Sequence, residues 1–170
     1  MSKPASIAPN RHLTSKEHLR LWLRLLRTTR RVESELRERL RLQFNTTLPR
    51  FDVMAALSRH PNGLKMNELS QQLKVSNGNV TGIISRLVED GWVERIAIEG
   101  DRRATRVLLT RTGSEQFHQM AQAHEYWVDE LFSSLSSQET HHMNELFAHL
   151  PTEAGPEPDS PEPNTQGDTP

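Results

Sequence analysis

The chain has 170 residues, no cysteine, 34% hydrophobic residues, and 21 basic against 22 acidic side chains, for a formal net charge of −1. This length allows one domain, or one domain with a tail. The lack of cysteine excludes disulfides, thiol nucleophiles, cysteine-based zinc sites and thiol redox sensing. No apolar run is long enough to span a membrane and the N-terminus lacks the apolar core of a signal peptide, so we expect a cytoplasmic protein.

The two ends of the chain differ in composition from its body. Residues 151–170 contain six prolines, two glycines, five acidic side chains and no Lys or Arg, which predicts a disordered, acidic, Pro-rich tail. Residues 1–13 are polar and predict a flexible N-terminus. Residues 1–150 carry 21 basic and 17 acidic side chains, a net charge of +4. The overall charge is therefore an average of unlike parts and does not argue against nucleic-acid binding.

The first predicted element is a long helix over residues 14–44, followed by a shorter helix that starts at Pro49. Eight arginines between Arg20 and Arg41 cover the other faces of the long helix. Its apolar positions recur at helical spacing: Leu19, Trp22, Leu26, Thr29, Val32, Leu36 and Leu40. The second helix runs through Phe51, Met54, Ala55 and Leu57 and ends before the turn at residues 61–63.

Two short helices are predicted next, over residues 66–74 and 77–90. Ser76 is the expected N-cap of the second, and Gly91 is its expected C′ glycine. The apolar period then changes to two, which predicts paired strands over residues 92–98 and 105–109 with a polar tip at 99–103. Two further helices are predicted, over residues 111–134 and 136–150. A capping box of Ser136 and Glu139 starts the last one.

This order predicts a mainly α protein with a small β-hairpin, that is, a winged helix–turn–helix lobe over residues 45–110 flanked by helices. Within the lobe, the helix over 77–90 has an outward face of small polar residues and glycines: Asn77, Gly78, Thr81, Gly82 and Ser85. Each glycine inside a helix costs roughly 1 kcal/mol relative to alanine. A recognition helix that approaches the major groove closely would account for that cost. Close packing on a protein neighbour is the alternative.

The predicted hairpin tip carries Arg102 and Arg103, with Arg106 just beyond them. Arginines at such a tip suit the narrow, electronegative minor groove. Asp101 could hold a neighbouring guanidinium in a bidentate pair and so preset the loop. An ordinary solvated turn is the alternative for this sequence.

Over residues 15–150 the chain resembles the MarR family of bacterial transcriptional regulators. Five segments in order carry the resemblance: MNELSQQL (66–73), VSNGNVT (75–81), LVEDGWVER (87–95), DRR (101–103) and LTRTG (109–113). The resemblance implies a homodimer in which helices 14–44 and 111–150 dimerise. It also implies a palindromic double-stranded DNA operator, release by a small-molecule effector, no catalysis and no cofactor. Lys65 departs from the Ser or Thr cap that is common in the family.

The resemblance places the wing arginine of the family on Arg103, with Asp101 as its orienting acid. The full set of residues that we expect to contact DNA is Ser76, Asn77, Gly78, Asn79, Thr81, Gly82, Ser85, Arg86, Asp101, Arg102 and Arg103.

The segments LWLRLL (21–26), TTLPRFD (46–52) and VSNGNVT (75–81) look like family members that control aromatic-acid degradation. Those members respond to hydroxycinnamoyl- or benzoyl-coenzyme A thioesters or to free aromatic acids. An aromatic ring needs a partly apolar slot, and a carboxylate or phosphate needs guanidinium partners. The expected effector residues are Trp22, Arg27, Arg30, Arg31, Arg50, Phe51 and Met54. Ordinary core and surface roles are the alternative for each.

Other functions have weaker support in the sequence. The eight histidines do not fall at metal-ligand spacing, so no metal site is expected. No phosphate-binding loop or nucleophile–base set is present, so we do not expect an enzyme. Our leading hypothesis is a repressor of transcription. The alternative is a winged-helix module that binds another protein and has no specific affinity for DNA.

Overall fold

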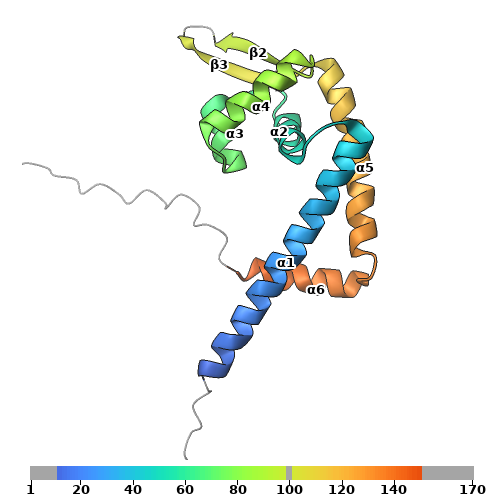
Figure 1. Cartoon of the computed structure of the whole chain (residues 1–170). Helices are drawn as coiled ribbons and strands as arrows, with labels where there is room; N and C mark the ends of the chain where they lie inside the picture. The colour runs from blue at the N-terminus through green and yellow to red at the C-terminus, as the bar shows by residue number, and fades with distance from the viewer. Residues whose placement is uncertain (1–10, 99–100, 151–170) are drawn as a thin grey trace, which may run out of the picture. The chain divides into compact units, whose positions relative to one another are not determined.

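The structure is a computed structural model that describes residues 11–98 and 101–150, with the side chains of residues 15–97 and 105–150. The chain divides between Leu131 and Phe132 into two compact units. Helices and strands follow in the order α1 (Arg11–Phe44), α2 (Leu48–Ser58), β1 (Leu64–Lys65), α3 (Met66–Leu73), α4 (Asn77–Glu89), β2 (Val93–Ile98), β3 (Asp101–Leu109), α5 (Arg111–Phe132) and α6 (Ser137–Ala148) (Figure 1). The predicted fold class, a mainly helical chain with a small antiparallel sheet, is confirmed.

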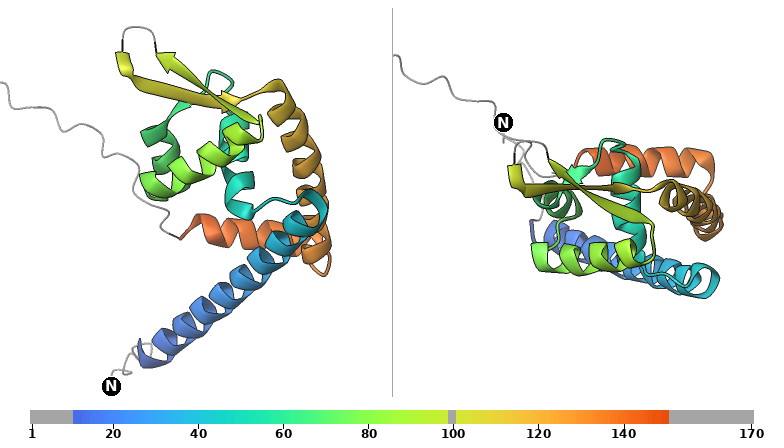
Figure 2. Two further views of the ribbon diagram at one scale, coloured as in Figure 1. Left: turned by 45° about the horizontal axis from the view of Figure 1, so that its top comes forward. Right: turned by 90° about the horizontal axis from the view of Figure 1, so that it is seen from above.

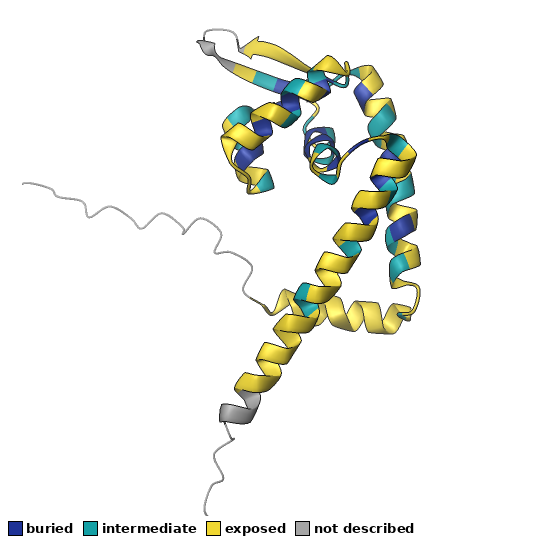
Figure 3. Ribbon diagram, in the orientation of Figure 1, coloured by how far each residue is buried: buried dark blue, intermediate teal, exposed yellow. Residues whose placement is uncertain are grey.

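Helices α2, α3 and α4 and the sheet pack around one apolar core. Val53 and Met54 of α2, Leu69 of α3, and Ile84 and Leu87 of α4 are fully buried in it. Figure 3 shows the buried positions of these helices on their facing sides, with exposed positions on the outer side of α4. The exposed side of α4 therefore corresponds to the outward face predicted for residues 77–90.

The sheet has three antiparallel strands in the order β1-β3-β2, one more than the sequence predicted. Strand β1 contributes only two pairs, Leu64 with Val107 and Lys65 with Arg106. Two residues are too short for an alternating pattern to be visible, which explains why the sequence did not show it. Strands β2 and β3 form a hairpin that extends beyond the helices of the lobe (Figure 2).

Gly63 turns the chain into β1 with φ +73°, a left-handed conformation that favours glycine. A Cβ at this position would lie 2.7 Å from the Val107 carbonyl oxygen. Arg106 fixes the same turn, because its Nη1 donates to the Gly63 carbonyl at 3.1 Å. The turn at residues 61–63 is thus tied directly to the middle of β3.

Helices α1 and α5 lie side by side over the C-terminal part of α1 (Figures 1 and 2). Leu36 and Leu40 are buried in the core, and the ring centroids of Phe44 and Trp127 lie 6.1 Å apart. Arg39 donates from Nη1 to Glu130 at 2.6 Å and from Nε to Glu35 at 2.8 Å. The hydrogen bond from Arg39 holds the pKa of Glu130 below its ordinary value.

The N-terminal part of α1 leaves large apolar side chains exposed (Figure 3). Leu19, Leu21 and Trp22 are each more than half exposed. Helix α6, which belongs to the second unit, begins with the predicted capping box: Glu139 N donates to Ser136 Oγ at 3.3 Å, and Ser136 N donates to Glu139 Oε2 at 2.9 Å. Its apolar side chains are also exposed: Met143, Leu146 and Phe147. Large exposed apolar patches mark interaction surfaces.

The element boundaries differ from the predictions by a few residues. Helix α1 begins at Arg11, three residues earlier than expected, and α6 ends at Ala148, two residues earlier. Strand β3 starts at Asp101 and so includes residues that were assigned to the polar tip. Residues 1–10, 99–100 and 151–170 lie outside the described residues, and with them the predicted acidic tail and most of the predicted flexible N-terminus. No described helix is long and apolar enough to cross a membrane.

Candidate nucleic-acid interface and the adjoining groove

Helix α4 has one buried apolar face and one exposed polar face. Val80, Ile84 and Leu87 are buried, whereas Asn77, Gly78, Asn79, Thr81, Gly82 and Arg86 are exposed. Ser76 caps the helix as predicted, because its Oγ accepts from Asn79 N at 3.4 Å. Gly91 follows the helix with φ +72°, as expected of a C′ glycine. The predicted helix is therefore confirmed, and so is its outward face, except that Ser85 is half-buried.

The two glycines of α4 are not required for packing inside the chain. A Cβ at Gly78 or at Gly82 would meet no atom within 4 Å among the described residues. Close packing on an intramolecular neighbour therefore does not explain why glycine occupies these positions.

Two hydroxyls on α4 already have partners inside the protein. Thr81 Oγ1 donates to the Asn77 carbonyl at 2.8 Å, and Ser85 Oγ accepts from Arg95 Nη2 at 2.9 Å. Arg95 belongs to β2, so this second bond ties the hairpin to the middle of α4. Ser85 is half-buried and serves in this structure as an anchor for the hairpin.

The wing residues named from the sequence fall at the start of β3. Asp101 pairs with Ile98 in the ladder, after a register shift between Ala97 and Ile98. The side chains of Asp101, Arg102 and Arg103 lie outside the described residues. Their place on β3 puts all three at the outer end of the hairpin (Figure 1).

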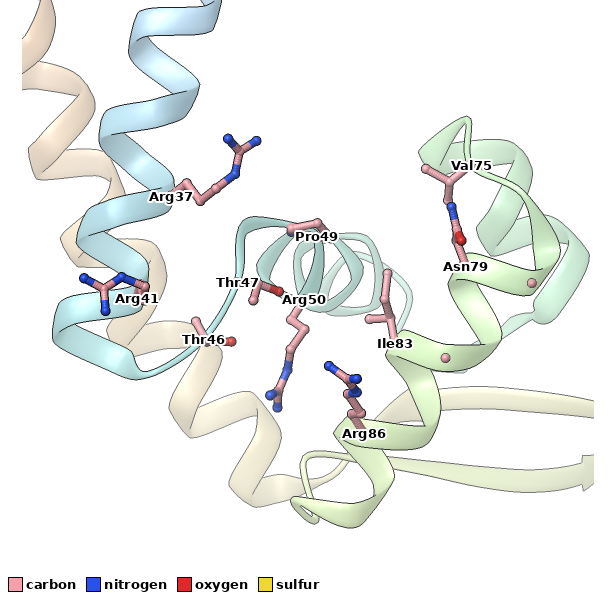
Figure 4. A pocket seen from close by; sticks show the side chains of 12 residues that line it. Arg37, Arg41, Thr46, Thr47, Pro49, Arg50, Val75, Asn79, Ile83 and Arg86 are labelled. Carbon is pink, nitrogen blue, oxygen red and sulfur yellow. The ribbon is translucent and has the colours of Figure 1, made fainter.

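A groove of about 680 Å³ opens beside the outward face of α4 (Figure 4). It is lined by Arg37, Arg41, Thr46, Thr47, Pro49, Arg50, Val75, Gly78, Asn79, Gly82, Ile83 and Arg86. These residues come from α1, the α1–α2 connection, the start of α2, the α3–α4 turn and α4. In Figure 4 the side chains of Arg50 and Arg86 extend into the space between α2 and α4.

Four arginines give the groove its charge, and two of them have carboxylate partners. Arg41 bonds to Glu38 at 2.6 and 3.0 Å, and this hydrogen bond lowers the pKa of Glu38. Arg50 donates to Asp90 at the C-terminal end of α4. Among the described residues, no ion pair engages Arg37 or Arg86. The groove therefore attracts anions.

Two buried polar atoms at the groove lack hydrogen-bond partners. They are Thr46 Oγ1 and Arg50 Nε, and within the described residues no other buried side-chain polar atom is unpartnered. The Thr46 residue is only 2% exposed. Unsatisfied buried polar groups are uncommon in native proteins, so these two atoms need an explanation.

The structure brings together only part of the predicted effector set. Arg50 lines the groove, while Phe51 and Met54 lie in the core beneath it. Phe51 stacks on His124 with ring centroids 4.7 Å apart, and burial lowers the pKa of that histidine. The other four, Trp22, Arg27, Arg30 and Arg31, are exposed on α1 and do not line the groove.

Several residues that line the groove were not predicted from the sequence. Arg37 and Arg41 are four residues apart and so share one face of α1, a signal that was available in the sequence. Thr46 and Thr47 gave no such signal, because their position depends on how the α1–α2 connection folds. Among the described residues, no cluster of three or more His, Asp or Glu side chains could hold a metal ion.

Comparison with known proteins agrees with this geometry. A sequence model described as "MarR family" matches residues 44–104. The HTH-type transcriptional regulator PecS of Dickeya dadantii is 28% identical over 102 residues, which cover 59% of this chain and only 61% of PecS. The crystal structure of a MarR family transcriptional regulator from Silicibacter pomeroyi is 34% identical, with a TM-score of 0.68, over 79% of this chain and 93% of that one.

A second solved structure contains nucleic acid. It is a mutant of MarR from E. coli complexed with operator DNA, and it is 26% identical to this chain with a TM-score of 0.69. The likeness covers 78% of this chain and 94% of that one.

Proposed function

This chain belongs to the MarR family of winged helix–turn–helix transcriptional regulators, and on that premise we propose that it binds a palindromic operator as a homodimer. The observation that carries the proposal is the open face of α4, where Gly78 and Gly82 have empty space beside them. Short polar side chains and bare backbone allow a helix to sit close to base edges in the major groove. The E. coli MarR complex with operator DNA gives further support.

We propose that the outward residues of α4 read the major groove in two half-sites about one helical turn apart. They are Ser76, Asn77, Gly78, Asn79, Thr81, Gly82 and Arg86, while Ser85 acts through its bond with Arg95. Asp101, Arg102 and Arg103 reach the minor groove from the outer end of the hairpin. The exposed apolar stripes of α1 and α6 supply the dimer interface. The protein acts in the cytoplasm, as a repressor.

Replacement of Arg103 by alanine is expected to weaken binding to the chain's own promoter region by roughly tenfold or more, because a cation is removed from the neighbourhood of the phosphates. The slope of log affinity against log salt becomes shallower by about one for each phosphate that the variant no longer neutralises. Fluorescence anisotropy at several salt concentrations measures both quantities. Arg24→Ala, on the exposed part of α1, is the matched control. Unchanged affinity and slope in Arg103→Ala would contradict the wing assignment.

We further propose that a small aromatic acid, or its coenzyme A thioester, releases the protein from DNA. The supporting observation is the cationic groove, because it shares Gly78, Asn79, Gly82 and Arg86 with the proposed DNA-binding face. A ligand that fills the groove and DNA that covers this face compete for the same residues. Trp22, Arg27, Arg30 and Arg31 remain proposed effector contacts on α1, outside the groove.

Addition of benzoate or benzoyl-coenzyme A to the protein–promoter complex is expected to release DNA in a dose-dependent manner, because ligand and DNA bind antagonistically. Coenzyme A alone and an uncharged analogue, benzamide, are the controls. If neither acid nor thioester displaces DNA at millimolar concentration, the aromatic effector is wrong for this chain.

A further inference from the structure

Arg50 lines the groove and contacts the C-terminal end of α4, the helix that we propose binds DNA. Its Nη2 donates to Asp90 Oδ2, and Asp90 is the C-cap residue of α4. Its guanidinium carbon lies 5.1 Å from the centroid of the Trp92 ring, and Trp92 immediately precedes β2. The Arg50 side chain is 16% exposed and that of Asp90 is 42% exposed. One guanidinium from α2 thus holds both the end of α4 and the entry to the hairpin.

The same guanidinium has an unused donor. Among the described residues, neither Arg50 Nε nor Thr46 Oγ1 has a hydrogen-bond partner, and both atoms are buried. Thr46, in the connection between α1 and α2, lines the same groove as Arg50. Arg50 Nε can only donate, and a hydroxyl can donate as well. Neither donor has an acceptor among the described residues, so both are available to an oxygen of a bound ligand. A carboxylate or phosphate oxygen is the acceptor that a guanidinium binds most strongly.

We propose that Thr46 Oγ1 and Arg50 form the seat for an anionic group, and that this anion competes with Asp90 for the Arg50 guanidinium. The anion is a carboxylate of a free aromatic acid or a phosphate of a coenzyme A thioester. This inference rests on the proposed effector response and names the contact through which the effector acts.

Competition at Arg50 links the groove to DNA binding. The Arg50–Asp90 pair fixes the C-terminal end of α4, and an anion beside Arg50 both repels the Asp90 carboxylate and takes hydrogen bonds from its partner. Arg50 therefore acts as a positioning residue for α4 when the seat is empty and as a ligand contact when it is occupied. By linkage, the factor by which the anion weakens DNA binding equals the factor by which DNA weakens anion binding.

Asp90→Asn separates the two roles, because it removes the competing charge while it keeps the size of the side chain. In the full chain, calorimetry is expected to show benzoate or benzoyl-coenzyme A binding three- to tenfold more tightly than to the wild type. Thr46→Val, which removes only the hydroxyl, is expected to bind the same ligand at least threefold more weakly. Glu89→Gln is the matched control, since it removes a neighbouring exposed carboxylate that has no ion pair among the described residues.

The readouts distinguish this inference from the proposed function. Free benzoate, benzoyl-coenzyme A and coenzyme A are titrated separately, so that the tighter binder identifies carboxylate or phosphate as the anion. If Asp90→Asn binds the anion more tightly but the wild type does not bind the promoter, the result would support the anion site at Thr46 and Arg50 and would contradict the proposed function in transcription. If the protein binds the promoter but Asp90→Asn and Glu89→Gln bind the anion with equal affinity, the anion does not compete with Asp90 for Arg50. If none of the three ligands gives a heat of binding with either folded protein, wild type or Asp90→Asn, the proposed anion site is wrong.

Discussion

A Gly82→Gln variant is expected to lose at least tenfold in affinity for the chain's promoter region while its fold becomes slightly more stable. Gly82 lies on the outward face of α4, and a Cβ there would meet no atom of the described residues within 4 Å. The new side chain therefore costs the free protein nothing, and glutamine favours a helix over glycine by roughly 0.5–1 kcal/mol. In the complex it fills the space that DNA must occupy, and each reduction of about 1.4 kcal/mol in binding free energy is a factor of ten.

The contrast between stability and binding makes this variant informative. Thermal unfolding followed by circular dichroism measures the first quantity, and anisotropy titration of labelled promoter DNA measures the second. Ser114→Gln, at an exposed position of α5, introduces the same side chain away from α4 and is expected to bind as the wild type does. Undiminished affinity in Gly82→Gln would show that the open face of α4 does not approach DNA.

A Gly113→Ala variant is expected to have the opposite profile, with a large decrease in stability. A Cβ at Gly113 would lie 1.9 Å from the Trp92 carbonyl oxygen and 2.7 Å from the Trp92 carbonyl carbon. Both atoms are backbone, so no side-chain rotation relieves the clash. The Trp92 carbonyl also accepts from Thr110 N at 3.0 Å, which holds it in place. The clash forces α5 away from the backbone of Trp92, and this should lower the free energy of unfolding by ~3 kcal/mol.

For a chain of this length, 1 kcal/mol corresponds to about 2–4 °C, so the melting temperature of Gly113→Ala should fall by about 6–12 °C. Gly78→Ala is the matched control, because it adds the same methyl group to a helical glycine with open space around it. That control is expected to melt at or slightly above the wild-type temperature. A melting temperature of Gly113→Ala equal to that of Gly78→Ala would contradict the close contact between α5 and β2.

The sequence predicted most of the helices well because local signals define their ends. The caps at Ser76 and Ser136 and the C′ glycine Gly91 lie within a few residues of the helix ends that they mark. The apolar spacing of α4 depends on that helix alone. Strand β1 was not predicted, because a two-residue strand shows no apolar period and forms only through its pairing with β3.

The groove was harder to predict because it depends on tertiary contacts. Arg37 and Arg86 come from helices far apart in the sequence, and only the folded lobe brings them to one surface. Arg50 was named from its charge, but its bond with Asp90 and its place over Trp92 require the packing of α2 on α4. Trp127 was missed as a core residue, since its neighbour Phe44 is distant in the chain.

In the proposed function, the open face of α4 binds operator DNA in a dimer. Its most direct test is an anisotropy titration of the full chain against its own promoter region and against a scrambled duplex, at two salt concentrations. We expect saturable binding with two chains per duplex, preference for the promoter sequence, and an affinity that falls steeply with salt. Absence of binding to the promoter region even at low salt would contradict the claim and would favour a winged-helix module that binds another protein.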